Sequence, residues 1–507
     1  MGQIYSATSS LFSSWSEKSF AVVHEETTAS VHPPDLASFT PSTYPLATPR
    51  RALCRTKRSG STSPDHAREP PTKRLRRDCQ YLNFPFLNDD FTIDFVQKSK
   101  VMFIMKGLPG SGKTFIGEVI QEVYKDTCVC SADHYFMQDG VYEFDREKLK
   151  EAHEYCQQQA ASAAEQSIHV IVIDNTNLKH WEMKFYLNLA RTHLYIPVVV
   201  EPQTTWAVHP AELAVKNIHN IPEEILSDKI KAYQPVLPIY YGWFLNEVDS
   251  EEICSIGWSW FQKALGVQDF VEHFSQAFQA DSNEDLHSFF AQDIVADRRR
   301  VLHATSKFTA RGKSMGANEY INSPVVKQSL GKGFRLCVVG FVITTRTIGA
   351  RLKLTKEQLE LWSSDDHEDP PVTLLNSGVL KKHQFSHSNS DRSKEKFRFS
   401  KYKNTSVCLP SVTEREIFCD EDRFYPTSGK GSRAHLTLAC APGIKPVTTG
   451  FDLILAVRCE QRMRKGENQK AETYVIDGGI LMNYGEGIWV VYPNSEMLVS
   501  SLFSAFV

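Results

Sequence analysis

The sequence predicts an α/β protein in which a parallel-sheet domain is followed by a two-lobed α+β domain. The chain of 507 residues is too long for one ordinary core, so two or three domains are expected. Between residues 101 and 202, short apolar runs alternate with amphipathic stretches, which favours a parallel sheet covered by helices. After residue 301 the apolar runs become more strand-like, which indicates a second domain of mixed class.

Residues 1–78 are predicted to be disordered. They are rich in Ser, Thr, Pro and Arg and show neither helical nor strand periodicity. The formal net charge of the chain is −3, but basic residues gather at 50–77, where acidic residues are few. These basic residues could bind anionic lipid or RNA, and residues 73–77 could instead be a nuclear-import signal. The alternative is a solvated run of charges without a partner.

Residues 79–265 are predicted to form the parallel-sheet domain. The runs VMFIMK (101–106), HVIVID (169–174) and YIPVVVEP (195–202) are short enough and apolar enough for buried strands. FIGEVIQEVYKDT (115–127) carries apolar residues at helical spacing.

Residues 266–300 are predicted to be a helical connector, and residues 301–507 the second domain. Its expected strands are FRLCVVGFVITT, GARLKL, RAHLTLAC, FDLILAVRC, TYVIDGG and GIWVVYP. The stretch 363–428 has little core material, and we expect an exposed insertion there.

Composition excludes several classes of protein. The 11 cysteines are scattered and contain no C-x-x-C pair, which favours reduced thiols over a disulfide framework or a zinc site. No apolar run approaches the ~18 residues needed to span a bilayer. The N-terminus lacks the order of a secretory signal, and a cytoplasmic protein is expected.

The strongest local motif is GLPGSGKT at residues 107–114, which lies between a predicted strand and a predicted helix. Glycines let backbone amides surround phosphate oxygens, and the helix N-terminus adds positive potential. The motif predicts a nucleotide site at Gly107, Gly110, Ser111, Gly112, Lys113 and Thr114, with Lys113 on the terminal phosphates and Thr114 on Mg²⁺. The alternative is a glycine-rich turn without a ligand.

Two aspartates are candidate partners of this phosphate site. Asp174 ends the predicted strand HVIVID, at the edge of the sheet where ligands gather, and Asp133 follows another predicted strand. One carboxylate could hold metal-bound water while the other accepts a hydroxyl proton, as in phosphoryl transfer. Helix or turn capping is the alternative for both.

Two H-x-T triplets suggest a second site. His303 and Thr305, and likewise His435 and Thr437, are two residues apart, so each pair faces one side of a strand while neighbouring residues enter a core. Hydrolysis of a phosphodiester requires a base for water and an acid for the leaving oxygen, and imidazole serves both near neutral pH. The two hydroxyls could stabilise charge on the phosphate without a metal. Surface decoration is the alternative for either pair.

With these motifs the chain resembles the 2′,3′-cyclic-nucleotide 3′-phosphodiesterase family, myelin-associated enzymes of the two-histidine phosphoesterase group. The resemblance runs from about Asn83 to near the C-terminus and rests on FPFL, GLPGSGKT, SADHY, VEPQTTW, LPIYYGWFL, VLHATSKF, ITTRTIGARLKL with QLELW, and GSRAHLTLAC.

The resemblance implies metal-independent hydrolysis of 2′,3′-cyclic nucleotides, or of RNA ends bearing a cyclic phosphate, to 2′-phosphates. It places His303, Thr305, His435 and Thr437 at catalytic positions and Phe308, Arg433 and Val447 in the substrate pocket. It also implies a first domain similar to polynucleotide kinases that binds a nucleotide (ATP or GTP, with Mg²⁺) or RNA. Which histidine is the base is left open.

The termini depart from the family pattern. The end SLFSAFV has no prenylation box, whereas MGQIYS fits a myristoylation signal on Gly2. One acyl chain binds membranes only marginally, so the basic residues at 50–77 would have to assist, and peripheral membrane attachment is expected on that basis.

Two further functions compete with hydrolysis: tethering of membrane to cytoskeleton or RNA, and an RNA-end kinase using Lys113 and Asp133.

Overall fold

The computed structural model describes residues 80–138, 141–278, 286, 290, 300–363, 430–464 and 471–507. The N-terminal region 1–78 with Gly2, most of the connector after residue 278, and the insertion from residue 364 onward lie outside the described residues.

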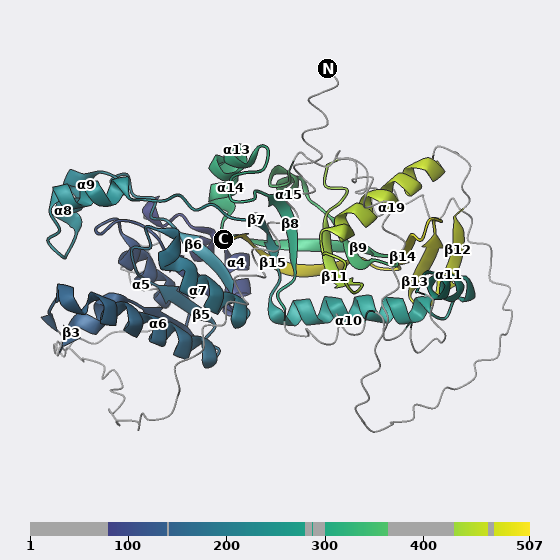
Figure 1. The fold of residues 1–507 in the computed structure, drawn as a ribbon, viewed down its shortest axis with the longest axis horizontal. Helices are drawn as coiled ribbons and strands as arrows, with labels where there is room; N and C mark the ends of the chain where they lie inside the picture. Colours follow the sequence, from purple (N-terminus) through teal and green to yellow (C-terminus); the bar gives the residue numbers. More distant parts are fainter. Residues whose placement is uncertain are drawn as a thin grey trace, which may run out of the picture. The chain divides into compact units, whose positions relative to one another are not determined.

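The first domain is built on a parallel sheet of four strands in the order β2-β5-β1-β6. Figure 1 labels β5 and β6 of this sheet and the helices α5, α6 and α7 of the same domain. The strands are β1 (Val101–Met105), β2 (Thr127–Cys130), β5 (Val170–Ile173) and β6 (Ile196–Val200). Strand β1 is buried along its whole length, as its apolar sequence predicts for a strand covered on both faces. The parallel α/β class expected from the sequence is confirmed.

Helices cover both faces of this sheet. Helix α5 packs on one face through Ile116 and Ile120, and α6 and α7 pack on the other through Ala160 and Met183. The helical elements are η1 (Gln80–Leu82), α3 (Pro85–Asn88), α4 (Asp90–Gln97), α5 (Lys113–Val123), η2 (Ala132–Phe136), η3 (Arg146–Lys148), α6 (Leu149–Glu165), α7 (His180–Thr192), α8 (Pro210–Lys216) and α9 (Glu223–Lys231). A two-stranded sheet joins β3 (Met137–Gln138) to β4 (Val141–Tyr142).

The second domain is built on a sheet of nine strands. One path runs β12-β13-β14-β9-β15-β7-β8, and β10 and β11 branch from β9. The strands are β7 (Tyr240–Phe244), β8 (His303–Phe308), β9 (Gly333–Ile343), β10 (Thr347–Lys353), β11 (His435–Cys440), β12 (Glu472–Ile476), β13 (Gly479–Asn483), β14 (Trp489–Pro493) and β15 (Met497–Phe506). Its helices are α10 (Glu247–Ala264), α11 (Gln268–Phe278), α13 (Ala317–Asn322), α14 (Pro324–Ser329), α15 (Lys356–Glu360) and α19 (Thr448–Arg464).

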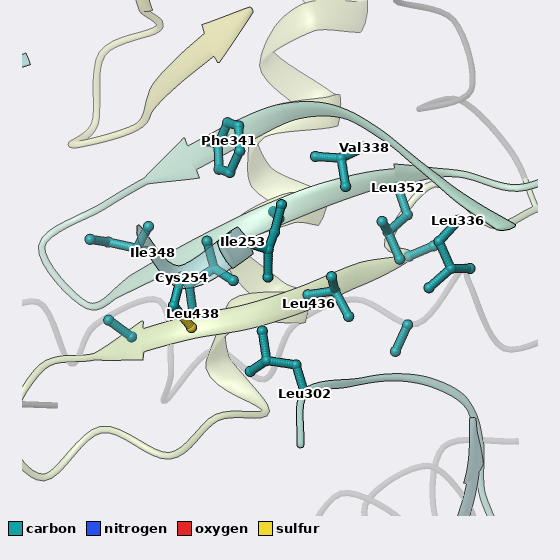
Figure 2. Packing of buried hydrophobic residues seen from close by; sticks show 14 of the residues in the cluster. Ile253, Cys254, Leu302, Leu336, Val338, Phe341, Ile348, Leu352, Leu436 and Leu438 are labelled. Atoms are coloured by element: carbon teal, nitrogen blue, oxygen red, sulfur yellow. The ribbon is translucent and has the colours of Figure 1, made fainter. Parts of the chain in front are cut away.

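One face of this sheet carries the main hydrophobic core (Figure 2). Leu302 and Ala304 beside β8 and Leu436 and Leu438 on β11 enter it, and all four are buried, as the sequence predicts. Helix α10 covers this core, since Ile253 and Cys254 belong to the same cluster. The alternate residues of β8 and β11 therefore face the opposite side of the sheet.

The junction between the sheets lies earlier in the chain than the predicted boundary at residue 265. Strand β7 pairs with β8 and β15, and α10 packs in the second core, so residues from Tyr240 onward belong structurally with the second sheet. The sequence YYGWF has no alternation of apolar and polar residues, because one of its faces enters the second core and the other packs against the first domain. Such a run carries no period-2 signal.

The predicted strand at 451–459 is wrong. FDLILAVRC lies inside helix α19. Leu453, Ala456 and Cys459 are buried in one cluster at spacings of three, which fits one face of a helix. A short apolar run does not distinguish a buried strand from a buried helix.

Within the described ranges, no helix is long and apolar enough to cross a bilayer.

Candidate active site and P-loop

A β-bulge aims three side chains of β8 in one direction. Across the β7–β8 ladder His303 pairs with Phe244, Thr305 with Gly242 and Phe308 with Tyr240, and the register shifts at Gly242. Paired residues of antiparallel strands share a face, so His303, Thr305 and Phe308 all lie on the face opposite the main core. Without the bulge Phe308, at an odd offset from Thr305, would point into the core.

Gly242 permits this bulge. A Cβ atom there would lie 2.3 Å from the carbonyl oxygen of Ala304, a distance that only a shift of the backbone could relieve. Glycine is therefore required where the two strands approach each other.

Strand β11 presents His435 and Thr437 on the corresponding face. Both are half-buried, between neighbours that are fully buried. The Nδ1 atom of His435 lies 2.7 Å from the carbonyl oxygen of Arg433. Because a carbonyl only accepts, the neutral ring carries its proton on Nδ1, which leaves Nε2 free for a substrate.

Strands β8 and β11 contact each other, which brings the two H-x-T pairs together. The Arg300 guanidinium, just before β8, donates a hydrogen bond to the carbonyl of Leu438 on β11. The two imidazoles are close enough for His435 to contribute to the lowered pKa of His303.

Aromatic rings hold His303. Its ring stacks on Tyr240 with centroids 4.6 Å apart and on Phe244 at 5.5 Å. Tyr240 in turn stacks on Phe506 of β15 at 4.9 Å, and the Arg191 guanidinium of α7 lies 4.8 Å from the Phe506 ring centroid. Among the described residues no hydrogen-bond partner reaches the His303 ring, so stacking sets its plane.

Burial favours the neutral form of both histidines. Burial, together with the neighbouring His435, lowers the pKa of His303 to about 4. Burial also lowers the pKa of His435 to about 4, against the opposing effect of its hydrogen bond to Arg433. A bound phosphate anion would stabilise the imidazolium form and raise both values.

The first turn of α19 completes this face. Thr437 donates to the hydroxyl of Thr449 at 3.1 Å, and a Cβ at Gly450 would lie 3.2 Å from Cε1 of His435. The positive end of the helix therefore lies against the second H-x-T pair.

Two buried ionic contacts attach the rest of α19 to the sheet. Asp452 accepts hydrogen bonds from Thr344, Thr347 and Arg346, and Glu460 forms a buried bidentate pair with Arg351. These contacts fix α19 to the sheet.

The predicted substrate-pocket residues border the same face. Phe308 is 42% exposed and Val447, just before α19, is 50% exposed, so both offer apolar surface to a ligand. Arg433 precedes β11 and contacts His435 through its carbonyl. Four further residues of this face, Tyr240, Gly242, Thr449 and Gly450, were not predicted from the sequence. For the last two, Pro446 was a signal that a helix could begin just after it.

The P-loop joins β1 to α5, with backbone that only glycine adopts easily. Gly110 has φ +80° and its Cβ would lie 2.9 Å from the backbone of Leu213 and of Asn217. The Lys113 ammonium donates to the Leu108 carbonyl at 2.9 Å, and burial lowers the pKa of Lys113 to about 8. The buried hydroxyl of Ser111 has no hydrogen-bond partner among the described residues.

The two predicted aspartates lie near this loop. Asp174 interacts with Lys113 and accepts a hydrogen bond from Thr114, although burial raises the pKa of its carboxyl. Asp133 lies 3.5 Å from the His219 ring and accepts a hydrogen bond from Tyr142. Burial would raise the pKa of the Asp133 carboxyl. The contacts with His219 and Tyr142 and the charge of Lys113 outweigh burial, so the pKa is lowered.

Comparisons with known proteins give the family of the chain. The family described as 2′,3′-cyclic nucleotide 3′-phosphodiesterase matches residues 237–390 and 418–507. The protein named 2′,3′-cyclic-nucleotide 3′-phosphodiesterase from Pongo abelii is 30% identical over 441 residues, 85% of this chain and 88% of that protein. Its Mus musculus counterpart is 30% identical over 434 residues, covering 84% and 87%. The chain belongs to the 2′,3′-cyclic-nucleotide 3′-phosphodiesterase family.

The first domain of this phosphodiesterase has a second resemblance. Residues 102–236 match a family described as an AAA domain. Human NEDD4-binding protein 2 is 43% identical over 134 residues, which make up 26% of this chain and 8% of that protein. The match extends the P-loop assignment beyond the eight-residue motif to a whole domain.

Proposed function

We propose that the two H-x-T pairs of this chain catalyse its phosphodiesterase reaction. Membership of the family gives the activity: hydrolysis of 2′,3′-cyclic nucleotides. The observation that carries the residue assignment is that β8 and β11 contact each other and present His303, Thr305, His435 and Thr437 on the face opposite the main core.

The chemistry follows from two imidazoles beside a phosphate. A neutral ring accepts a proton from water as its oxygen attacks phosphorus, and the P–O3′ bond breaks while the other ring, protonated, gives its proton to O3′. The product is a 2′-phosphate. Thr305 donates to a non-bridging oxygen, and Thr437 does so when its hydroxyl turns from Thr449 to the substrate. The first turn of α19 adds positive potential. These groups supply the acid, the base and the charge stabilisation without a metal.

The substrate enters with its base against Phe308 and Val447. Both expose apolar surface, Phe308 on the face of β8 that carries His303 and Val447 just before α19. Such surface suits stacking of a nucleobase and does not distinguish a free nucleotide from an RNA end. We therefore propose RNA 2′,3′-cyclic phosphate ends as a second substrate.

The test is hydrolysis of 2′,3′-cyclic AMP in EDTA, with separation of 2′-AMP from 3′-AMP. We expect wild type to release 2′-AMP and His303→Ala or His435→Ala to lose at least about a hundredfold in kcat, the scale of one acid–base group. His169→Ala removes an imidazole from the first domain and is the matched control. Near-normal turnover by either active-site variant would reject the assignment.

We further propose that the P-loop binds the phosphates of a nucleotide with Mg²⁺. The support is the loop conformation, the Lys113 ammonium directed at the loop, and the Ser111 hydroxyl, which has no hydrogen-bond partner within the described part of the chain. Thr114 and Asp174 are the oxygen donors that a magnesium ion would use directly or through water. Since burial lowers the pKa of Lys113 to about 8, we expect ATP affinity to decrease as the pH rises above 8 and Lys113→Met to remove that dependence.

Peripheral membrane attachment is proposed on sequence grounds. Gly2 supplies a myristoylation signal and residues 50–77 supply basic charge. Unchanged membrane association of Gly2→Ala in fractionated cells would reject it.

A further inference from the structure

Strand β2 carries two cysteines whose thiols lie side by side. Cys128 and Cys130 pair across the ladder with Ile171 and Ile173 of β5, so both side chains point to the face of the sheet that α6 covers. Their sulfur atoms are 3.7 Å apart, and both are free thiols. We propose that Cys128 and Cys130 are an oxidation site, which closes to a reversible disulfide and loosens the end of β2.

The place of β2 in the sheet gives an oxidant access to one of the two thiols. In the strand order β2-β5-β1-β6, β2 is outermost. Cys128 is half-buried, whereas Cys130 is fully buried in the cluster that contains Ala160 of α6. A small soluble oxidant, such as glutathione disulfide, therefore reaches Cys128 first, and Cys130 is placed to resolve the intermediate.

The contact between the two sulfur atoms also divides their roles. The hydrogen bond from Cys130 lowers the pKa of the Cys128 thiol to about 7, against the opposing effect of burial. The same contact, together with burial, raises the pKa of the Cys130 thiol. Since the thiolate is the nucleophile in thiol–disulfide exchange, Cys128 attacks the oxidant and Cys130 keeps its proton until the second step.

The exchange balances with glutathione disulfide as the oxidant. The Cys128 thiolate, having given its proton to water, attacks one sulfur of glutathione disulfide, which forms a mixed disulfide and releases one glutathione thiolate. Cys130 passes its proton to that thiolate and attacks the Cys128 sulfur. The second glutathione leaves and takes up the proton that Cys128 had given to water. Two protein thiols are thereby oxidised, and one glutathione disulfide is reduced to two glutathione thiols.

The spacing of the two residues predicts a strained disulfide that is readily reduced. Residues i and i+2 of a strand have Cα atoms about 6.6 Å apart, close to the upper limit of about 6.8 Å for a disulfide. Closing the bond must pull β2 out of its extended form, against the ladder to β5 that holds it. Strained disulfides are the labile ones, which suits a reversible site.

This strain acts on the residues that follow β2. The Asp174 amide donates to the Cys130 carbonyl at 2.9 Å, and the Ser131 hydroxyl donates to the Asp174 carbonyl at 2.9 Å. Bending β2 at Cys130 weakens both hydrogen bonds, so we expect the Asp174 amide proton to exchange with solvent faster in the oxidised protein.

A third cysteine of the same cluster is the alternative partner for Cys128. The Cys156 sulfur accepts hydrogen bonds from the Tyr186 hydroxyl at 3.2 Å and from the Asn175 amide at 3.3 Å. Burial raises the pKa of the Cys156 thiol, which makes it a poorer nucleophile. We therefore expect the bond to form within β2 and not between β2 and α6.

The experiment is equilibration of the full chain in glutathione buffers, followed by alkylation of free thiols and mass spectrometry of tryptic peptides. Cleavage after Lys125 and Arg146 gives one peptide that contains Cys128 and Cys130 and no other cysteine. In excess glutathione disulfide we expect this peptide to escape alkylation and to be two hydrogen atoms lighter than its reduced form. In excess reduced glutathione both thiols should return. Hydrogen exchange at the Asp174 amide should be at least about tenfold faster in the oxidised protein.

Variants test the role of each thiol. Cys130→Ala leaves Cys128 without a resolving thiol, so we expect a glutathione adduct on Cys128 in place of the disulfide. Cys128→Ser should leave the buried Cys130 unmodified. Cys156→Ala should keep the disulfide, and so should the matched control Cys337→Ser, which removes another half-buried cysteine from β9.

The decisive outcomes come from wild type, so they stand even where a variant fails to fold. Two alkylated thiols in excess glutathione disulfide would overturn the oxidation site. A bond from Cys128 to Cys156 would also overturn it. A disulfide within β2 with unchanged exchange at Asp174 would overturn the loosening of β2.

Discussion

At the scale of single residues, the two histidines are held in different ways. Hydrogen bonding fixes the tautomer of His435, whereas flat contacts with Tyr240 and Phe244 fix the plane of His303. A hydrogen bond specifies which nitrogen bears the proton, while a stack leaves both nitrogens available. The two rings therefore need not be interchangeable as acid and base.

Tyr240 is accordingly predicted to position His303. Tyr240→Leu removes the ring beneath the imidazole, and we expect kcat for 2′,3′-cyclic AMP to fall by roughly ten- to a hundredfold, as for small misplacements of a reacting group. Tyr240→Phe keeps the ring and is the matched control. We expect a smaller change in KM than in kcat, because Tyr240 stacks directly on the imidazole and meets Phe308 only as its partner in the strand ladder. A larger effect on KM than on kcat would contradict the positioning role.

The lowered histidine pKa values also predict how stability depends on pH. A histidine side chain has an ordinary pKa of about 6.5, whereas burial lowers the pKa of His303 and of His435 to about 4. Between these two pH values, both side chains bind more protons in the unfolded chain than in the folded one. The contribution of these two histidines to the free energy of unfolding therefore falls as the pH drops from about 6.5 to about 4.

We expect the variant with both His303→Gln and His435→Gln to lose less thermal stability over that interval than wild type. The measurement is the melting temperature at pH 7.0 and at pH 4.5, compared as a difference within each protein. Equal differences in the two proteins would show that other groups carry the acid sensitivity.

At the scale of elements, the bulge between β7 and β8 is the feature on which the site depends most. It needs a residue without Cβ at Gly242, because Ala304 occupies the space. We expect Gly242→Ala to destabilise the protein by about 1–3 kcal/mol, the usual cost of overpacking, and to turn Phe308 away from the site, which would raise KM.

Gly117→Ala is the control for this prediction. A Cβ there would meet only Val172 at an ordinary 3.5 Å, inside helix α5 where alanine is favoured over glycine. An unchanged KM in Gly242→Ala would mean that Phe308 does not depend on the bulge.

Some of these strands and helices could be predicted from the sequence, and others could not. The strands β1, β5 and β6 and helix α5 were predicted because each is a short, regular pattern bounded by turn residues. The burial of Leu436 and Leu438 followed from alternation alone. Strand β15 was missed because its serines interrupt the apolar pattern, and Ser501 and Ser504 are satisfied only by partners distant in the sequence, Phe334 and Pro197. The orientation of Phe308 depends on a register shift, which no local pattern encodes.

At the scale of the whole molecule, the junction between the two sheets lies at the amino ends of the parallel strands. Lys100, just before β1, pairs with Glu247 at 2.9 Å, and Ser504 of β15 donates to the carbonyl of Pro197 near the start of β6 at 2.5 Å. The P-loop follows the carboxyl end of β1, so it lies at the end of the strands away from this junction. The two sites therefore share a scaffold without sharing residues.

This arrangement predicts that the two sites act separately. We expect saturating ATP to change kcat/KM for 2′,3′-cyclic AMP by less than about twofold, because a larger coupling needs an element with two discrete arrangements that both ligands bias. Lys113→Met should weaken ATP binding and leave hydrolysis intact, while His435→Ala should weaken hydrolysis and leave ATP binding intact. A stack of side chains that would break this independence runs from Arg191 through Phe506 and Tyr240 to His303. If ATP alters kcat in wild type but not in Arg191→Ala, that stack transmits nucleotide binding to the catalytic histidine, and the separation of the two sites is only spatial.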